Sequence, residues 1–121
     1  MEEDFNAAIT VLENKFIVAL PAEMTNENIL NIEKVITEKA YQTGINGAIL
    51  NFSMVTVMDT YTYQAFERIT SVFALMGIQT IWVGLRPGVV FGLIELNVAI
   101  NAKIKMAINL ENGLALLSES K

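Results

Sequence analysis

One short motif places a carboxylate and a hydroxyl side by side where both could act. Asp59 and Thr60 precede a segment in which apolar residues recur at three- and four-residue spacing, which predicts an amphipathic helix. Both residue types cap helix starts well, because backbone N–H groups there lack partners. Those N–H groups and the helix dipole also favour a phosphate. The motif therefore predicts either a plain cap or a phosphorylation site at Thr60, with Asp59 as the acceptor's neighbour.

The composition excludes most enzyme chemistries. The chain has no histidine and no cysteine, which excludes Ser/His/Asp hydrolysis, thiolate catalysis, disulfides and the commonest zinc sites. Its only aspartates are Asp4 and Asp59, so the acid cluster with which a phospho-aspartate receiver holds magnesium is missing. Gly84, Gly88 and Gly92 are spaced too widely for a dinucleotide loop, and the phosphate-loop lysine is absent. We therefore expect a non-enzymatic protein with no metal and no cofactor.

Three other side chains could belong to a site, but each has a simpler interpretation. Glu95 is the only acid in strongly apolar sequence, and one carboxylate does not make a catalytic pair, so a helix-surface or interface position is simpler. Arg86 could bind an anion or be an ordinary turn residue. Trp82 is expected in the core.

Charge and hydropathy bound the choice of partners. The net charge is −5 and there is no cluster of basic residues, so we expect no nucleic-acid partner. Hydrophobic residues make up 53% of the chain, yet no window of about eighteen uninterrupted apolar residues occurs, so no membrane span is expected. The acidic start, residues 1–4, lacks the basic region of a signal peptide. We expect a soluble cytoplasmic protein whose apolar excess partly covers subunit contacts.

The chain alternates strands and helices after an initial hairpin. Alternating or buried apolar runs predict strands over 5–12, 15–20, 48–52 and 78–84, and a short edge strand over 104–107. The predicted helices are one from the Thr25 cap to Gly44, one from Asp59-Thr60 to Gly77, one from the 86–88 turn to Asn97 or Asn101, and one capped by Asn109. This order predicts a single α/β domain over 1–121, with a mixed, mostly parallel sheet of four to five strands, an N-terminal β-hairpin and about four helices.

Two features predict contact with partners. Tyr61 and Tyr63 fall in the first turn of the second helix, and tyrosine is favoured in contact patches. Inward packing is the alternative for Tyr63, because it shares a helix face with Phe66. The third helix is apolar on all sides over 89–96, so it should be largely buried or lie in an interface.

Several segments together carry a resemblance to a known family. They are Met58-Asp59-Thr60, the Gly-x-x-Pro turn at 84–87, Leu-Ile-Glu-Leu at 93–96 and Asn-Leu-Glu-x-Gly-Leu at 109–114. With the order of elements, they resemble STAS domains, the anti-sigma-factor antagonist family, over nearly the whole chain. The similarity is greatest to the small stand-alone members found in stressosomes.

The resemblance implies a scaffold that also acts as a phospho-switch. In such proteins the hydroxyl residue after the Asp, here Thr60, is phosphorylated by an ATP-dependent serine/threonine switch kinase. The proteins self-associate and assemble with paralogous STAS proteins that carry sensory N-terminal domains, forming a cytoplasmic shell that sequesters the kinase until phosphorylation releases it. A cognate phosphatase is a further implied partner. The implied partner-binding residues are Thr25, Met58, Tyr61 and Tyr63.

The sequence also departs from the family pattern, and other functions stay open. The stand-alone members usually carry Ser where Thr60 stands, and the loop after the second strand reads Glu23-Met24-Thr25 instead of Glu-Leu-Asp. Both departures bear on which residue the kinase prefers to phosphorylate.

Two other functions stay open. The alternatives are a plain anti-sigma-factor antagonist, which need not build a large assembly, and a small-ligand-binding module with a pocket near the start of the second helix.

Overall fold

The structure is a computed structural model that describes residues 7–119. The acidic start and the first two residues of the first predicted strand lie outside the described residues. The strands are β1 (Ala8–Leu12), β2 (Lys15–Ala19), β3 (Gly47–Asn51), β4 (Gln79–Val83) and β5 (Lys105–Ala107). The helices are α1 (Asn26–Thr43), α2 (Thr60–Leu75), α3 (Pro87–Glu95) and α4 (Leu110–Glu119).

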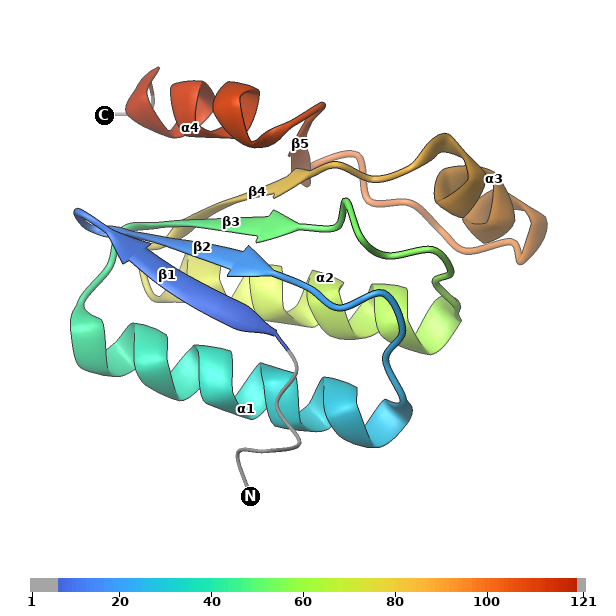
Figure 1. Cartoon of the computed structure of the whole chain (residues 1–121), viewed down its shortest axis with the longest axis horizontal. Coiled ribbons are helices and arrows are strands. Elements are labelled where there is room, and N and C mark those ends of the chain that lie inside the picture. Colours follow the sequence, from blue (N-terminus) through green and yellow to red (C-terminus); the bar gives the residue numbers. More distant parts are fainter. Residues whose placement is uncertain (1–6, 120–121) are drawn as a thin grey trace.

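The strands form one five-stranded sheet in the order β1-β2-β3-β4-β5. β1 and β2 pair antiparallel as a hairpin, and every other neighbouring pair is parallel. Helices α1 and α2 cover one face of the sheet and α4 lies over the other (Figure 1). The prediction of a mixed α/β domain with an N-terminal hairpin is therefore confirmed, and the strand ends differ from the expected ones by a few residues.

Two apolar clusters hold the layers together. The larger one lies between the sheet and α1 and α2, where Trp82 packs against Phe52 and Tyr63 with ring centroids 4.8 and 5.6 Å apart. The smaller one lies under α4 and includes Ile49, Ile81, Val83 and Leu117. The expected core position of Trp82 is confirmed.

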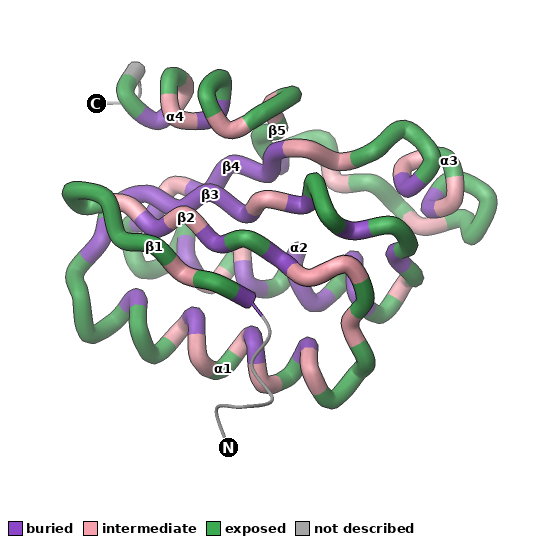
Figure 2. Tube along the Cα trace, in the orientation of Figure 1, coloured by how far each residue is buried: buried purple, intermediate pink, exposed green. Residues whose placement is uncertain are grey.

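Helix α3 corrects one expectation. Only Val89 and Leu93 of this helix are buried, while Phe91 and Ile94 are 61% and 58% exposed. Figures 1 and 2 show the reason, because α3 lies beyond the end of the sheet and packs through one side only. The helix is thus not largely buried within the chain, and its place in an interface stays a prediction.

The parallel strands bring three loops to one edge of the sheet. The chain leaves β2, β3 and β4 at their carboxyl ends and enters α1, α2 and α3, so the starts of these helices gather at that edge (Figure 1). Among the described residues, no helix is long and apolar enough to span a bilayer. In the same range, no three acidic, histidine or cysteine side chains are grouped so as to hold a metal ion.

Candidate functional site

Helix α2 begins as the sequence predicts. The Asp59 carboxylate accepts a hydrogen bond from the backbone N–H of Thr62 at 2.9 Å, and the Asp59 carbonyl accepts one from Tyr63 at 3.0 Å. Asp59 is thus the N-cap, and Thr60 is the first residue of the helix. Thr60 is half-buried, and within residues 7–119 its hydroxyl has no hydrogen-bond partner. The hydroxyl is therefore free for chemistry at the positive end of α2.

The loop that leads into α2 is held by its neighbours. Ser53 N–H donates to the Asn51 side chain at 3.0 Å, and Arg86 Nε donates to the Ser53 carbonyl at 3.0 Å. Gly84, with φ of +78°, lets the loop after β4 approach, since a Cβ there would lie 3.0 Å from Ser53 Cβ. Arg86 is therefore an exposed turn residue that fixes the loop before α2.

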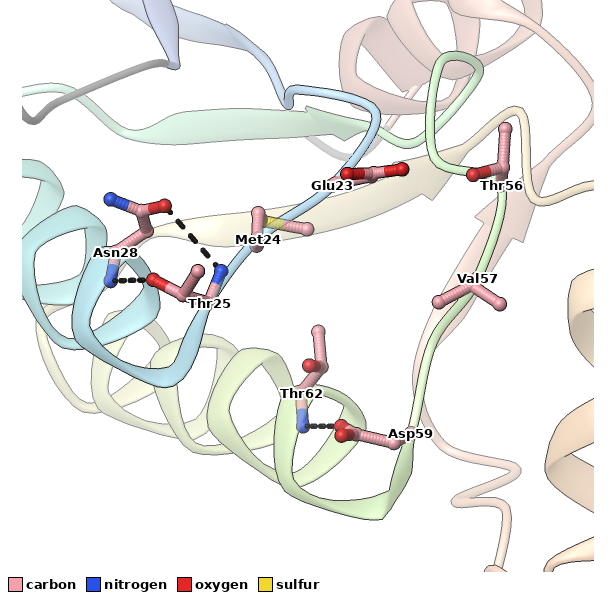
Figure 3. Close-up of a pocket in the computed structure, with 8 residues that line it drawn as sticks. All are labelled: Glu23, Met24, Thr25, Asn28, Thr56, Val57, Asp59 and Thr62. Atoms are coloured by element: carbon pink, nitrogen blue, oxygen red, sulfur yellow. Dashed lines mark hydrogen bonds between the residues drawn. The ribbon is translucent and has the colours of Figure 1, made fainter.

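The starts of α1 and α2 face each other across a depression of about 610 Å³ (Figure 3). Its walls are tied together by a backbone hydrogen bond of 3.4 Å from Thr56 N–H to the Ala22 carbonyl. The lining residues come from both helix entries: Glu23, Met24, Thr25, Asn28, Thr56, Val57, Asp59 and Thr62. The site thus combines two carboxylates, several hydroxyls and two apolar side chains.

Both capping hydrogen bonds are formed at the N-terminus of helix α1. The Thr25 hydroxyl accepts from Asn28 N–H at 3.0 Å, and Thr25 N–H donates to Asn28 Oδ1 at 3.4 Å, as Figure 3 shows. This reciprocal pair is a capping box. The predicted cap is confirmed, and Thr25 stands on the exposed rim of the depression with its hydroxyl engaged.

A second depression of about 310 Å³ separates the loop before α2 from α3. Val57 and Asp59 line both depressions, and Val57 is 73% exposed. Glu95 lines the second depression and is exposed, as expected for a helix-surface carboxylate. Val57 therefore forms an exposed apolar ridge shared by the two depressions, three residues before Thr60, which itself lines neither of them.

Two of the predicted contact residues lie inside the protein. Tyr63 is 1% exposed, and its hydroxyl accepts from Asn101 N–H at 2.9 Å, which confirms the inward-packing alternative. Met58 is also buried, because its side chain belongs to the main core cluster. Tyr61 is 36% exposed, whereas Tyr63 and Met58 are buried, and Met58 reaches the surface only in the wall of the second depression.

The sequence reasoning missed the part that Val57 and Thr62 play. The signal in the sequence is that Val57, two residues before the Asp59 cap, is an apolar residue outside the helical pattern. Thr62 is buried at the third helical position and lines the depression. Its location follows from its spacing of three residues from Asp59, the spacing that a cap requires.

An exposed ion pair joins the two helices that frame the depression. Arg68 of α2 donates from Nε and Nη2 to the Glu33 carboxylate of α1 at 2.9 and 3.0 Å. The hydrogen bond to Glu33 raises the pKa of the Arg68 guanidinium, so this cation is held in its charged form.

Comparisons with known proteins agree with this geometry. The sequence matches the STAS domain family over residues 6–106. Among solved structures, a variant of RsbS from Moorella thermoacetica superposes with a TM-score of 0.81 at 19% identity, covering 94% of this chain and 96% of the other. A chain from the stressosome, described as a signal integration and transduction hub, gives 0.79 at 19% identity, with 93% and 96% covered.

A third solved structure is the Bacillus cell fate determinant SpoIIAA in its phosphorylated form. It gives a TM-score of 0.66 at 16% identity, covering 95% of this chain and 99% of the other. No match was found among curated proteins. At these identities the structures establish a shared fold, and the family match covers most of the sequence. The chain therefore belongs to the STAS domain family.

Proposed function

We propose that this protein is a non-enzymatic phospho-switch and scaffold of a bacterial stress-signalling complex of the stressosome type. It sequesters a serine/threonine switch kinase and releases it when Thr60 is phosphorylated. The observation that carries the proposal is the free Thr60 hydroxyl at the first position of α2, directly after the Asp59 cap and three residues after the exposed Val57. The fold that it shares with RsbS and with a phosphorylated SpoIIAA supports the same role.

The switch works through charge. A phosphate adds about −1.5 to −2 charges and strong acceptor oxygens. The start of α2 can accommodate it, since N–H groups in the first helical turn have no intrahelical acceptor, so the domain stays folded. A partner packed on Tyr61 and Val57 would then face a buried charge beside Asp59, and an unpaired buried charge typically costs several kcal/mol. The partner therefore leaves without a large change of shape.

The remaining partners follow from the assembly. The protein self-associates and joins paralogous STAS proteins that carry sensory domains, and the shell forms in the cytoplasm. A cognate phosphatase resets Thr60. Thr25, which lines the depression, and Tyr61, in the first turn of α2, are the exposed side chains of the predicted set, so a kinase can reach them.

The deciding experiment is phosphate transfer. The purified protein is incubated with ATP and the switch kinase from the same source, then measured by intact mass and peptide mapping. We expect one phosphate on Thr60, lost in Thr60→Ala and retained in Thr56→Ala, an exposed threonine four residues earlier that lines the depression in Figure 3. Transfer to another residue would overturn the assignment of Thr60. Neither binding nor transfer would favour the ligand-binding alternative, for which the depression in Figure 3 offers the site.

A plain anti-sigma-factor antagonist is the second candidate, favoured by the shared fold with SpoIIAA. It differs in assembly, because an antagonist acts as a monomer or small oligomer. Light scattering on a mixture with the paralogous STAS protein separates the two functions. A particle of high mass supports the scaffold, and its absence, with kinase binding intact, supports the antagonist.

A further inference from the structure

The sheet has one long edge without a partner. β1 pairs with β2 on one side, and within residues 7–119 no strand lies on its other side. The outermost position of β1 and its exposed trace are visible in Figures 1 and 2. Val11 and Leu12 of this strand are about half exposed. An unpaired strand edge is a template for pairing with another chain.

The register of the hairpin shows which backbone groups point outward. Leu12 pairs with Lys15 across the two-residue turn of Glu13 and Asn14. The pair that closes such a turn exchanges hydrogen bonds, and bonded and non-bonded pairs then alternate along the ladder. Thr10 is therefore bonded to β2, whereas the N–H and C=O groups of Ile9 and Val11 face away from it.

The two edges of the sheet differ in how they are protected. β5 has only three residues, carries Lys105 and follows Lys103, and short length and lysine are the usual protections of an edge. β1 has five residues, Ala-Ile-Thr-Val-Leu, with no charge and no proline. The absence of protection on β1 indicates that this edge is covered by a partner.

We propose that the β1 edge binds the β1 edge of a second copy of this chain. The strands run antiparallel about a two-fold axis at Thr10, so that Ile9 of each copy lies opposite Val11 of the other. These two pairs exchange about four backbone hydrogen bonds, since Ile9 and Val11 carry the outward groups. The pairing also covers Val11, which is 47% exposed, with the apolar side chain of Ile9.

Self-pairing is compatible with the charge of the protein. Two copies that each carry −5 repel, but no residue of β1 is ionisable. In the proposed register Glu13 lies opposite Ala7 of the second copy, so the two Glu13 carboxylates do not face each other. A charged side chain on a partner would find no opposite charge on β1, whereas an identical uncharged strand pairs the outward groups of Ile9 and Val11.

The inference does not rest on the proposed phospho-switch, because β1 lines neither depression. The first readout is sedimentation velocity over a range of concentrations. We expect a reversible dimer for the unchanged protein and a monomer for Val11→Pro, which removes an outward N–H and leaves the ladder to β2 intact. Val11→Lys, which adds a protective charge, should also give a monomer. Leu75→Lys is the matched control, because Leu75 is exposed on α2, and it should remain dimeric.

Amide hydrogen exchange gives an independent readout. The amides of Ile9 and Val11 should be protected only at concentrations where the dimer forms, whereas the Thr10 amide is protected throughout. Circular dichroism confirms that each variant is folded. A protein that stays monomeric with fast exchange at Ile9 and Val11 would overturn the proposal, as would a dimer that both Val11 variants retain.

Discussion

The starts of α1 and α2 lie across one depression and follow the same capping rule. They differ in which polar groups at the helix start form hydrogen bonds within the chain. At α1, Thr25 and Asn28 bond reciprocally, which satisfies the N-cap N–H as well as the third N–H of the helix. At α2, Asp59 bonds Thr62 in one direction only, and its own N–H has no acceptor within residues 7–119. The first helical residue is Asn26 in α1 and Thr60 in α2.

This difference distinguishes the N-terminus of α1, which is only capped, from the N-terminus of α2, which also offers a candidate functional site. Both ends carry the same positive potential, because both are N-termini of long helices. Only α2 combines that potential with a free hydroxyl, an apolar ridge at Val57 and a loop fixed by a neighbouring strand end. A cap alone therefore does not distinguish the two helix starts, and the proposed switch at α2 depends on the unused hydroxyl and the exposed apolar residue beside the cap.

The largest expected effect tests whether kinase binding depends on where a negative charge is added or only on the added charge itself. Thr60→Glu should weaken binding of the switch kinase on the order of 100- to 1000-fold, since a buried uncompensated charge costs about 3–5 kcal/mol. Asn26→Glu puts the same charge at the same position of α1, and we expect a change of less than about tenfold. Calorimetry on both variants measures the difference. Equal losses would mean that the kinase senses net charge and that the two helix starts are equivalent to it.

The next effect concerns the support of the loop before α2. Gly84→Ala forces a side chain at φ of +78° and brings its Cβ to 3.0 Å from Ser53, so we expect a loss of about 2–3 kcal/mol of unfolding free energy. Gly44→Ala at the end of α1 is the control, because it has φ of +68° and open space around the Cβ. It should cost about 1 kcal/mol from strain alone. Urea unfolding gives both values, and equal losses would show that the Ser53 contact contributes nothing.

The sequence contains enough to predict the fold and the caps. Helix α1, the Asp59 cap and the hairpin depend on local patterns of apolar spacing and capping residues, which act within a few positions. The inward turn of Tyr63 and the exposure of α3 depend on where these elements meet in space. Tyr63 reaches Asn101 and Trp82, residues far along the chain, and α3 lies beyond the sheet end. The three-residue spacing of Tyr63 from Phe66 offers inward packing as an alternative, but no local pattern encodes the contacts of Tyr63 with Asn101 and Trp82 or the position of α3.

A smaller effect compares the two caps directly. Thr25→Ala removes the hydroxyl that accepts from Asn28 N–H, while the backbone N–H of residue 25 can still donate to Asn28 Oδ1, and it should lower the unfolding free energy by about 1–2 kcal/mol. Asp59→Asn keeps an acceptor for Thr62 N–H but removes the charge at the helix N-terminus, so it should cost only about 0.3–1 kcal/mol. Thermal and urea unfolding of the two variants check the order. A larger loss for Asp59→Asn would mean that the charge, more than the hydrogen bond, holds α2.

The smallest expected effect tests whether the ion pair between Arg68 and Glu33 couples helices α1 and α2 energetically. Arg68 and Glu33 form a two-point contact between α2 and α1, but Arg68 is half exposed and the pair is screened by water. A double-mutant cycle with Arg68→Gln and Glu33→Gln should therefore give a coupling of about 0.2–1 kcal/mol. The coupling should shrink in 1 M salt, where the Debye length is about 3 Å. A larger coupling energy that salt does not change would show that water does not screen the ion pair and that it ties α1 firmly to α2.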